Sequence, residues 1–122
     1  MAKKILIIDD EPNIVMVVTS RLKAAGYEVV NAVDGKEGLE KAKKEMPDLI
    51  ILDLMLPKID GYTVCRMLKF DANFKQIPVI MFTARAQAAD KQTGTHVGAD
   101  AYITKPFEPQ TLMGEIRRLL KE

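Results

Sequence analysis

Several short apolar runs in this chain end in a polar or charged residue, and this pattern constrains the fold more than any other feature. Residues 49–52 are consecutive apolar residues followed by Asp53. Such a run predicts a strand that is covered on both faces and carries its acid at the carboxyl end. The pattern recurs at residues 5–8 before Asp9 and Asp10, at 79–82 before Thr83, and at 101–104 before Lys105.

Apolar residues at helical spacing separate these strands. The spacing predicts helices at about 12–25, 35–46, 61–68, 86–97 and 109–120, and a less apolar edge strand at 27–32. Strand and helix therefore alternate with short connections. We expect an α/β fold of the (βα)5 type: a doubly wound, five-stranded parallel sheet in the order 2-1-3-4-5, with helices on both faces.

Composition narrows the class of protein. A chain of 122 residues fits one domain, here residues 1–122, and its net charge of +1 gives no electrostatic reason to expect nucleic acid or an anionic membrane as a partner. The single cysteine, Cys65, excludes an internal disulfide and fits a reducing compartment. The sequence shows neither a signal peptide nor a membrane-spanning run. We expect a soluble cytoplasmic protein.

The polar strand ends define a candidate site. If the strands are parallel neighbours, Asp9, Asp10 and Asp53 converge, with Thr83 and Lys105 beside them. Two carboxylates about 4 Å apart repel by about 4 kcal/mol at an effective dielectric near 20. Such a site must protonate an acid or hold a cation, and an oxygen-only ligand set favours Mg²⁺, with Mn²⁺ as an alternative.

The same residues suggest a reaction. A carboxylate that the metal leaves free can act as a nucleophile, while Lys105 and Thr83 can contact phosphoryl oxygens. These parts describe phosphoryl transfer onto an aspartate. Each signal has an ordinary alternative when taken alone: Asp9 and Asp10 in a solvated turn, Asp53 as a helix cap, Lys105 as a surface lysine. The shared position at strand ends favours the functional interpretation.

The motifs resemble the receiver domain of two-component response regulators, and the resemblance covers essentially the whole chain. It is chemotaxis-receiver-like in its strand order, for which the chemotaxis receiver is a standard example. The residues that carry the resemblance are Asp9-Asp10, Asp53 within Leu-Asp-Leu-Met-Leu-Pro, Asp60-Gly61, Thr83-Ala84, Gly98-Ala99-Asp100 and Lys105-Pro106-Phe107.

The resemblance implies a role for each site residue. Asp53 would accept a phosphoryl group from the phosphohistidine of a histidine kinase or phosphotransfer protein. Asp9, Asp10, Asp53 and the backbone carbonyl of Met55 would bind Mg²⁺, and Thr83 and Lys105 would contact the phosphoryl oxygens. Tyr102 would act with Thr83 as an aromatic switch, and the small Ala84 would leave room for the phosphoryl group. Pro106 would follow a cis peptide bond. Met55 and Arg85 would tune the rate of dephosphorylation.

The resemblance also implies a signalling phosphoacceptor rather than a conventional enzyme, although one that promotes its own phosphorylation and dephosphorylation. The new charge would shift a surface formed by residues 88–97, 101–102 and 112–119, and so control a partner. The kinase would dock near Ile14, Val15 and the loop that holds Pro106.

Two other functions fit parts of the pattern. A magnesium-dependent phosphatase of the haloacid-dehalogenase type also uses a strand-end aspartate, but it needs a second acid at the position that Met55 occupies. A pseudo-receiver that binds partners without phosphorylation is the other alternative, although none of the acids or the lysine is missing here.

The output is open at this stage. The target is either a separate effector protein or an output domain outside this sequence. Receiver domains of winged-helix regulators commonly carry a second acid after Asp100 and a basic residue at position 115, whereas this chain has Ala101 and Glu115. We therefore expect a monomer without direct nucleic-acid binding, with a phosphorylation-linked dimer as the alternative.

Overall fold

A five-stranded parallel sheet forms the centre of the molecule, with strand order β2-β1-β3-β4-β5 as the sequence predicts. The structure is a computed structural model and describes residues 2–84 and 98–122. The elements are β1 (Lys4–Ile8), α1 (Pro12–Ala24), β2 (Glu28–Ala32), α2 (Gly35–Glu45), β3 (Leu49–Asp53), α3 (Gly61–Lys69), β4 (Val79–Ala84), β5 (Ala101–Lys105) and α5 (Pro109–Leu120). The helix predicted at 86–97, with Arg85 before it, lies outside the described residues.

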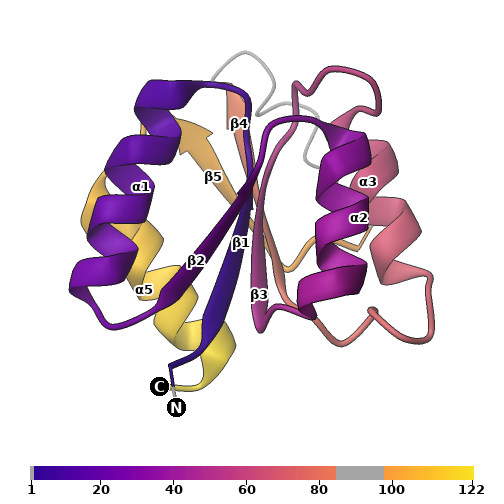
Figure 1. Cartoon of the computed structure of the whole chain (residues 1–122). Helices are drawn as coiled ribbons and strands as arrows, with labels where there is room; N and C mark the ends of the chain where they lie inside the picture. Colours follow the sequence, from indigo (N-terminus) through magenta and orange to yellow (C-terminus); the bar gives the residue numbers. More distant parts are fainter. Residues whose placement is uncertain (1, 85–97) are drawn as a thin grey trace.

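Within the described residues, two helices lie on each face of the sheet (Figure 1). Figure 1 shows α1 and α5 on one face and α2 and α3 on the other. Successive strand residues point to opposite faces, so each strand contributes to two cores. Within β1, Leu6 and Ile8 pack with α2 and α3, while Ile5 and Ile7 pack with α1 and α5. This double burial explains why the central strands are continuous apolar runs.

Local signals set the helix ends. The Asp34 carboxylate accepts a hydrogen bond from Glu37 N at 2.8 Å, and that of Asp60 accepts one from Thr63 N at 2.9 Å, so each aspartate caps the N-terminus of its helix. Gly26 has φ +93°, as expected for the glycine after a helix C-terminus.

The boundaries differ from the prediction by about one residue. The first strand, which the sequence predicts at about residues 4–9, ends at Ile8, and the Asp9 carboxylate accepts a hydrogen bond from Glu11 N at 2.9 Å. The fifth strand continues through Lys105 because Lys105 still pairs with Ala84 in the β4–β5 register.

A charged contact fixes the start of β5. Lys69 Nζ donates to Asp100 Oδ2 at 3.0 Å and to the Ile77 carbonyl at 2.9 Å, and Val79 N donates to the same Asp100 oxygen at 2.8 Å. The end of α3 is thereby tied to the beginnings of β4 and β5. None of the helices in the described ranges combines the length and apolar character that a bilayer span requires.

Candidate functional site: an acidic pocket with one lysine

The site lies where β1 and β3 meet at their carboxyl ends. These two strands are hydrogen-bonded neighbours, although residues 9–48 separate them in the chain. From β1 the chain continues through α1 to β2 on one side, and from β3 it continues through α3 to β4 on the other side. The connections therefore diverge between β1 and β3. The carboxyl ends at such a point are the usual ligand site of an open α/β sheet.

The three predicted acids converge there. Carboxylate oxygens of Asp9, Asp10 and Asp53 lie within 4.8 Å of one another. Asp9 and Asp53 are buried, whereas Asp10 is exposed. Backbone contacts fix the two buried acids, because Asp9 N donates to the Ala32 carbonyl at 3.0 Å and Met55 N donates to Asp53 Oδ1 at 3.3 Å.

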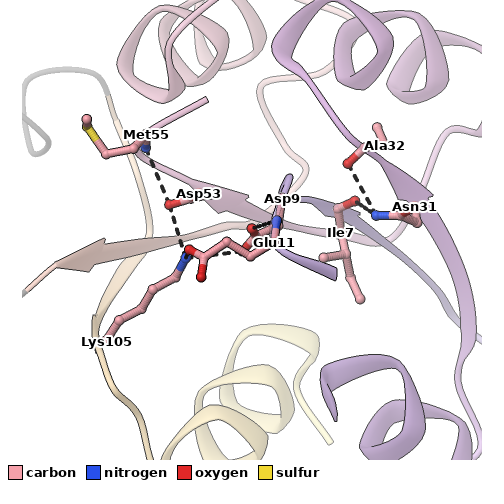
Figure 2. Close-up of polar contacts among 8 residues, drawn as sticks. All are labelled: Ile7, Asp9, Glu11, Asn31, Ala32, Asp53, Met55 and Lys105. Atoms are coloured by element: carbon pink, nitrogen blue, oxygen red, sulfur yellow. Dashed lines mark hydrogen bonds and ion pairs between the residues drawn. The ribbon is translucent and has the colours of Figure 1, made fainter. Parts of the chain in front are cut away.

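Lys105 reaches this cluster from the end of β5. Its Nζ lies 3.3 Å from both Asp9 Oδ2 and Asp53 Oδ1, and 2.9 Å from Glu11 Oε1 (Figure 2). The ammonium also lies 5.7 Å from the centre of the Phe82 ring, which stacks on Phe107. The ammonium thus lies near a stacked aromatic pair while it contacts the acids.

The electrostatics of the pocket favour a cation. Burial raises the pKa of Asp53 to about 6, the nearby Asp9 charge adds to this, and Lys105 only partly opposes it. Burial likewise raises the pKa of Asp9. Burial alone would lower the pKa of Lys105, but its hydrogen bond to Glu11 and the charges of Asp53 and Asp9 raise it. One ammonium therefore does not neutralise this group of carboxylates.

These residues fit a hard divalent cation. The three carboxylates offer only oxygen ligands. Two of these carboxylates are buried, and the third is open to solvent. Mg²⁺ prefers one or two carboxylates and keeps several water ligands, which an open-sided site allows. Within the described part of the chain, this is the one group of at least three acidic, histidine or cysteine side chains arranged to hold a metal.

Comparisons with known proteins agree with this geometry. A family model described as "Response regulator receiver domain" matches residues 5–117. This chain belongs to the response regulator receiver domain family. Of the curated relatives, the DNA-binding dual master transcriptional regulator RpaA of Synechocystis is 50% identical over 97% of this chain, but the match covers 49% of RpaA. The chain spans about half the length of the curated relatives it matches.

Solved receiver structures share the fold over their whole length. A putative response regulator from Chloroflexus aurantiacus has a TM-score of 0.94 and 37% identity, and the match covers 100% of both chains. The receiver domain of the sensor histidine kinase PA1611 from Pseudomonas aeruginosa has a TM-score of 0.90 and 29% identity, with 100% of both chains covered. The structure of PA1611 is described as containing a magnesium ion coordinated in the active-site cleft.

Most of the other predicted site residues belong to β4, to β5 or to the chain that directly follows them. Thr83 follows Phe82, the β4 residue that pairs with Asp53, and its buried Oγ1 has no hydrogen-bond partner among the described residues. Tyr102 is partly buried on β5 and pairs with Met81 in the sheet register. The Lys105–Pro106 peptide bond is cis. Arg85 and the side chain of Ala84 are outside the described residues.

Glu11 was absent from the predicted site. It is the third carboxylate on Lys105, from a position 94 residues away in the sequence. One signal in the sequence could have indicated it. Glu11 directly precedes Pro12, a typical first helical residue, and therefore occupies the N-cap position, where glutamate is not a preferred residue.

Proposed function

We propose that this receiver domain is the phosphoacceptor switch of a two-component phosphorelay, with Asp53 as the residue that is phosphorylated. One observation carries the proposal: the buried Asp53 carboxylate lies within 4.8 Å of two other carboxylates and 3.3 Å from the ammonium of Lys105. A lone surface aspartate has neither a cation site nor a counter-charge for a phosphoryl group, whereas Asp53 has both within contact distance.

In the proposed reaction an Asp53 oxygen attacks the phosphorus of a phosphohistidine. The new P–O bond forms as the P–N bond breaks, and the imidazole leaves with the electron pair. Asp9, Asp10, Asp53 and the Met55 carbonyl would hold Mg²⁺, which when bound would neutralise charge on the transferring group. The Lys105 ammonium and the Thr83 hydroxyl would stabilise the negative charge on the oxygens of the transferring phosphoryl group.

The same groups would read out phosphorylation. The modified Asp53 would carry more negative charge and three additional acceptor oxygens, which would recruit Lys105 and the Thr83 hydroxyl, a group with no hydrogen-bond partner among the described residues. Thr83 and Lys105 sit at the ends of β4 and β5, so their movement would reach Tyr102 on β5 and the surface of α5. Residues 88–97, which the sequence prediction includes in this surface, lie outside the described residues.

A hollow beside the acids supports docking of the phosphoryl donor. It has a volume of about 470 Å³, and its lining includes Asp9, Asp10, Val15, Met16 and Val33. The first two residues belong to the acidic cluster, so a donor helix packed on the apolar residues of α1 would bring its histidine towards Asp53. Docking near Ile14, Val15 and the loop that holds Pro106, as the family resemblance implies, is part of the proposal.

The test is uptake of labelled phosphate from acetyl phosphate in the presence of Mg²⁺, compared between the wild type and Asp53→Ala. We expect stoichiometric labelling of the wild type and none of the variant. Equal labelling of both would remove Asp53 from the proposed role, and no labelling of the wild type would favour a pseudo-receiver. Turnover of small phosphomonoesters, assayed in parallel, would instead indicate a phosphatase.

A further inference from the structure

Glu11 contacts Lys105 instead of capping its own helix. It occupies the N-cap position of α1 with extended backbone angles, φ −91° and ψ 108°, yet its side chain makes no capping hydrogen bond. The carboxylate reaches across the pocket, and Lys105 Nζ donates to Glu11 Oε1 at 2.9 Å. This is the shortest of the three carboxylate contacts that the structure gives the Lys105 ammonium.

Glu11 differs from the other two carboxylates on Lys105. Asp9 and Asp53 are buried members of the acidic cluster, whereas the Glu11 side chain is 56% exposed and lies outside that cluster. A lysine ammonium has three hydrogens to donate, and in this structure it faces three carboxylates. The ammonium donates hydrogen bonds to Asp9 and Glu11 and forms an ion pair with Asp53. A phosphoryl group on Asp53 that engages Lys105 would compete with these carboxylates for the ammonium, and Glu11 is the one that lies outside the acidic cluster.

We propose that Glu11 is a positioning residue that holds the Lys105 ammonium while Asp53 is unmodified and competes with the phosphoryl group for it. The inference rests on the proposed phosphoacceptor function. It adds a residue that sets the equilibrium between Lys105 bound to Glu11 and Lys105 bound to the phosphoryl group. Glu11 stabilises the unmodified form through the contact with Lys105. Loss of this contact shifts the equilibrium towards the form in which Lys105 binds the phosphoryl group.

Three variants separate contact from charge. Glu11→Gln keeps the length of the side chain and removes the charge, while Glu11→Asp keeps the charge but is too short for the same reach. Asp is also a preferred N-cap residue, so Glu11→Asp is expected to fold at least as stably as the wild type. The matched control is Glu45→Gln, which removes a 2.9 Å contact with Lys4 at the opposite end of β1 and changes the net charge equally.

The first measurement is the affinity for beryllofluoride, a non-covalent mimic of the aspartyl phosphoryl group, at saturating Mg²⁺. Partly exposed ion pairs are weak, so we expect binding about two- to tenfold tighter in Glu11→Gln and Glu11→Asp, and unchanged in Glu45→Gln. Mg²⁺ affinity, measured separately by calorimetry, fixes the saturating concentration for each variant. Unchanged beryllofluoride affinity in both Glu11 variants would show that Glu11 does not compete for Lys105. Tighter binding in Glu11→Gln alone would show that the charge of Glu11, and not its contact with Lys105, is the cause.

The second measurement reports on Lys105 without any phosphoryl analogue. The ¹⁵N–¹H signal of the Lys105 ammonium, assigned with Lys105→Arg, should shift in both Glu11 variants and stay in place in Glu45→Gln. An unmoved signal in the Glu11 variants would contradict the contact.

The two proposals fail differently. A wild type that takes up no phosphoryl group would contradict both proposals. A wild type that is labelled, with Glu11 variants that behave like it, would contradict only the role of Glu11.

Discussion

At the scale of single residues, Asp53 combines two properties that oppose each other. Its carboxylate is buried beside Asp9, which disfavours the charged form and raises its pKa to about 6. Its proposed role as a nucleophile needs the charged form. The fold therefore holds this carboxylate where its charged form is disfavoured, and a bound cation would offset that cost.

This conflict predicts that the metal-free protein is stabilised by Asp53→Asn. The pKa of Asp53 is higher in the folded chain than the ~3.9 of an unfolded aspartate, so the folded state binds more protons between about pH 4 and pH 6. Stability of the wild type should fall as the pH rises through this window. Urea unfolding in EDTA should show the variant about 1–3 kcal/mol more stable at pH 7, since one pKa unit corresponds to about 1.4 kcal/mol.

The gain should nearly vanish at pH 4, where Asp53 is protonated in the folded wild type. The exposed Glu40 on α2 provides a control with the same change of charge, and Glu40→Gln should show no such pH dependence. A stability gain of equal size at pH 4 and pH 7 would mean that the charge of Asp53 is not the cause.

The site residues at the strand ends could be predicted from the sequence, whereas Glu11 could not. The acids, Thr83 and Lys105 each follow an apolar run, so the strand pattern alone placed them at one edge of the sheet. Glu11 lies on no such pattern. Its contact depends on where the end of β5 lies relative to the start of α1, which is a tertiary relation that periodicity does not encode.

At the scale of elements, the packing of α3 against the end of β3 positions Asp53. A Cβ atom on Gly61 would lie 2.3 Å from the Asp53 carbonyl oxygen and 2.7 Å from Leu54 Cα. Gly61 N also donates to the Leu54 carbonyl at 2.9 Å. The first residue of α3 therefore has to be glycine for the helix to approach the strand this closely, and the Asp60 cap starts the helix at that residue.

We predict opposite effects for two glycine substitutions. Gly61→Ala forces a methyl group into backbone atoms that cannot move aside cheaply, and should lower the free energy of unfolding by about 1–3 kcal/mol or more. Gly114→Ala in α5 meets no atom within 4 Å and should raise it by up to about 1 kcal/mol, because alanine favours the helix. Chemical denaturation of both variants measures the difference. A neutral Gly61→Ala would show that α3 can withdraw from β3 without loss.

Elements were predictable to within about one residue, for identifiable reasons. Pro12, Pro109 and the aspartate caps mark helix starts by their own chemistry, whichever other segments surround them. Strand ends depend on pairing with a neighbour, and Lys105 belongs to β5 because it pairs with Ala84. The link from Lys69 to Asp100 and Ile77 joins residues that only the tertiary fold brings together, and no pattern in the sequence predicts it.

At the scale of the whole molecule, the strand order determines that the acids meet. Consecutive placement of the strands would separate β1 from β3, whereas the order β2-β1-β3-β4-β5 makes them neighbours. The alternation of strands and helices and the family resemblance together predicted this order. The folded chain must then hold mutually repelling carboxylates, and a bound cation would stabilise it.

Mg²⁺ should therefore raise the stability of the whole chain. A ligand that binds only the folded state at 100 times its dissociation constant adds about 2.7 kcal/mol to the free energy of unfolding. We expect an effect of this size in the wild type, its reversal by EDTA, and its loss in Asp10→Asn. Asp48→Asn, which removes a carboxylate contact to Lys4 N at the opposite end of the sheet, should keep the full effect. Equal responses of the two variants would place the ion elsewhere.

The identity of the phosphorylated residue tests the central claim most directly. The chain is incubated with acetyl phosphate and Mg²⁺, any acyl phosphate is reduced with borohydride, and the reduced position is located by peptide mass spectrometry. An aspartyl phosphate is converted to homoserine by this treatment. We expect homoserine at position 53 and at no other aspartate. Reduction at position 9 or 10, or an unmodified chain, would contradict it.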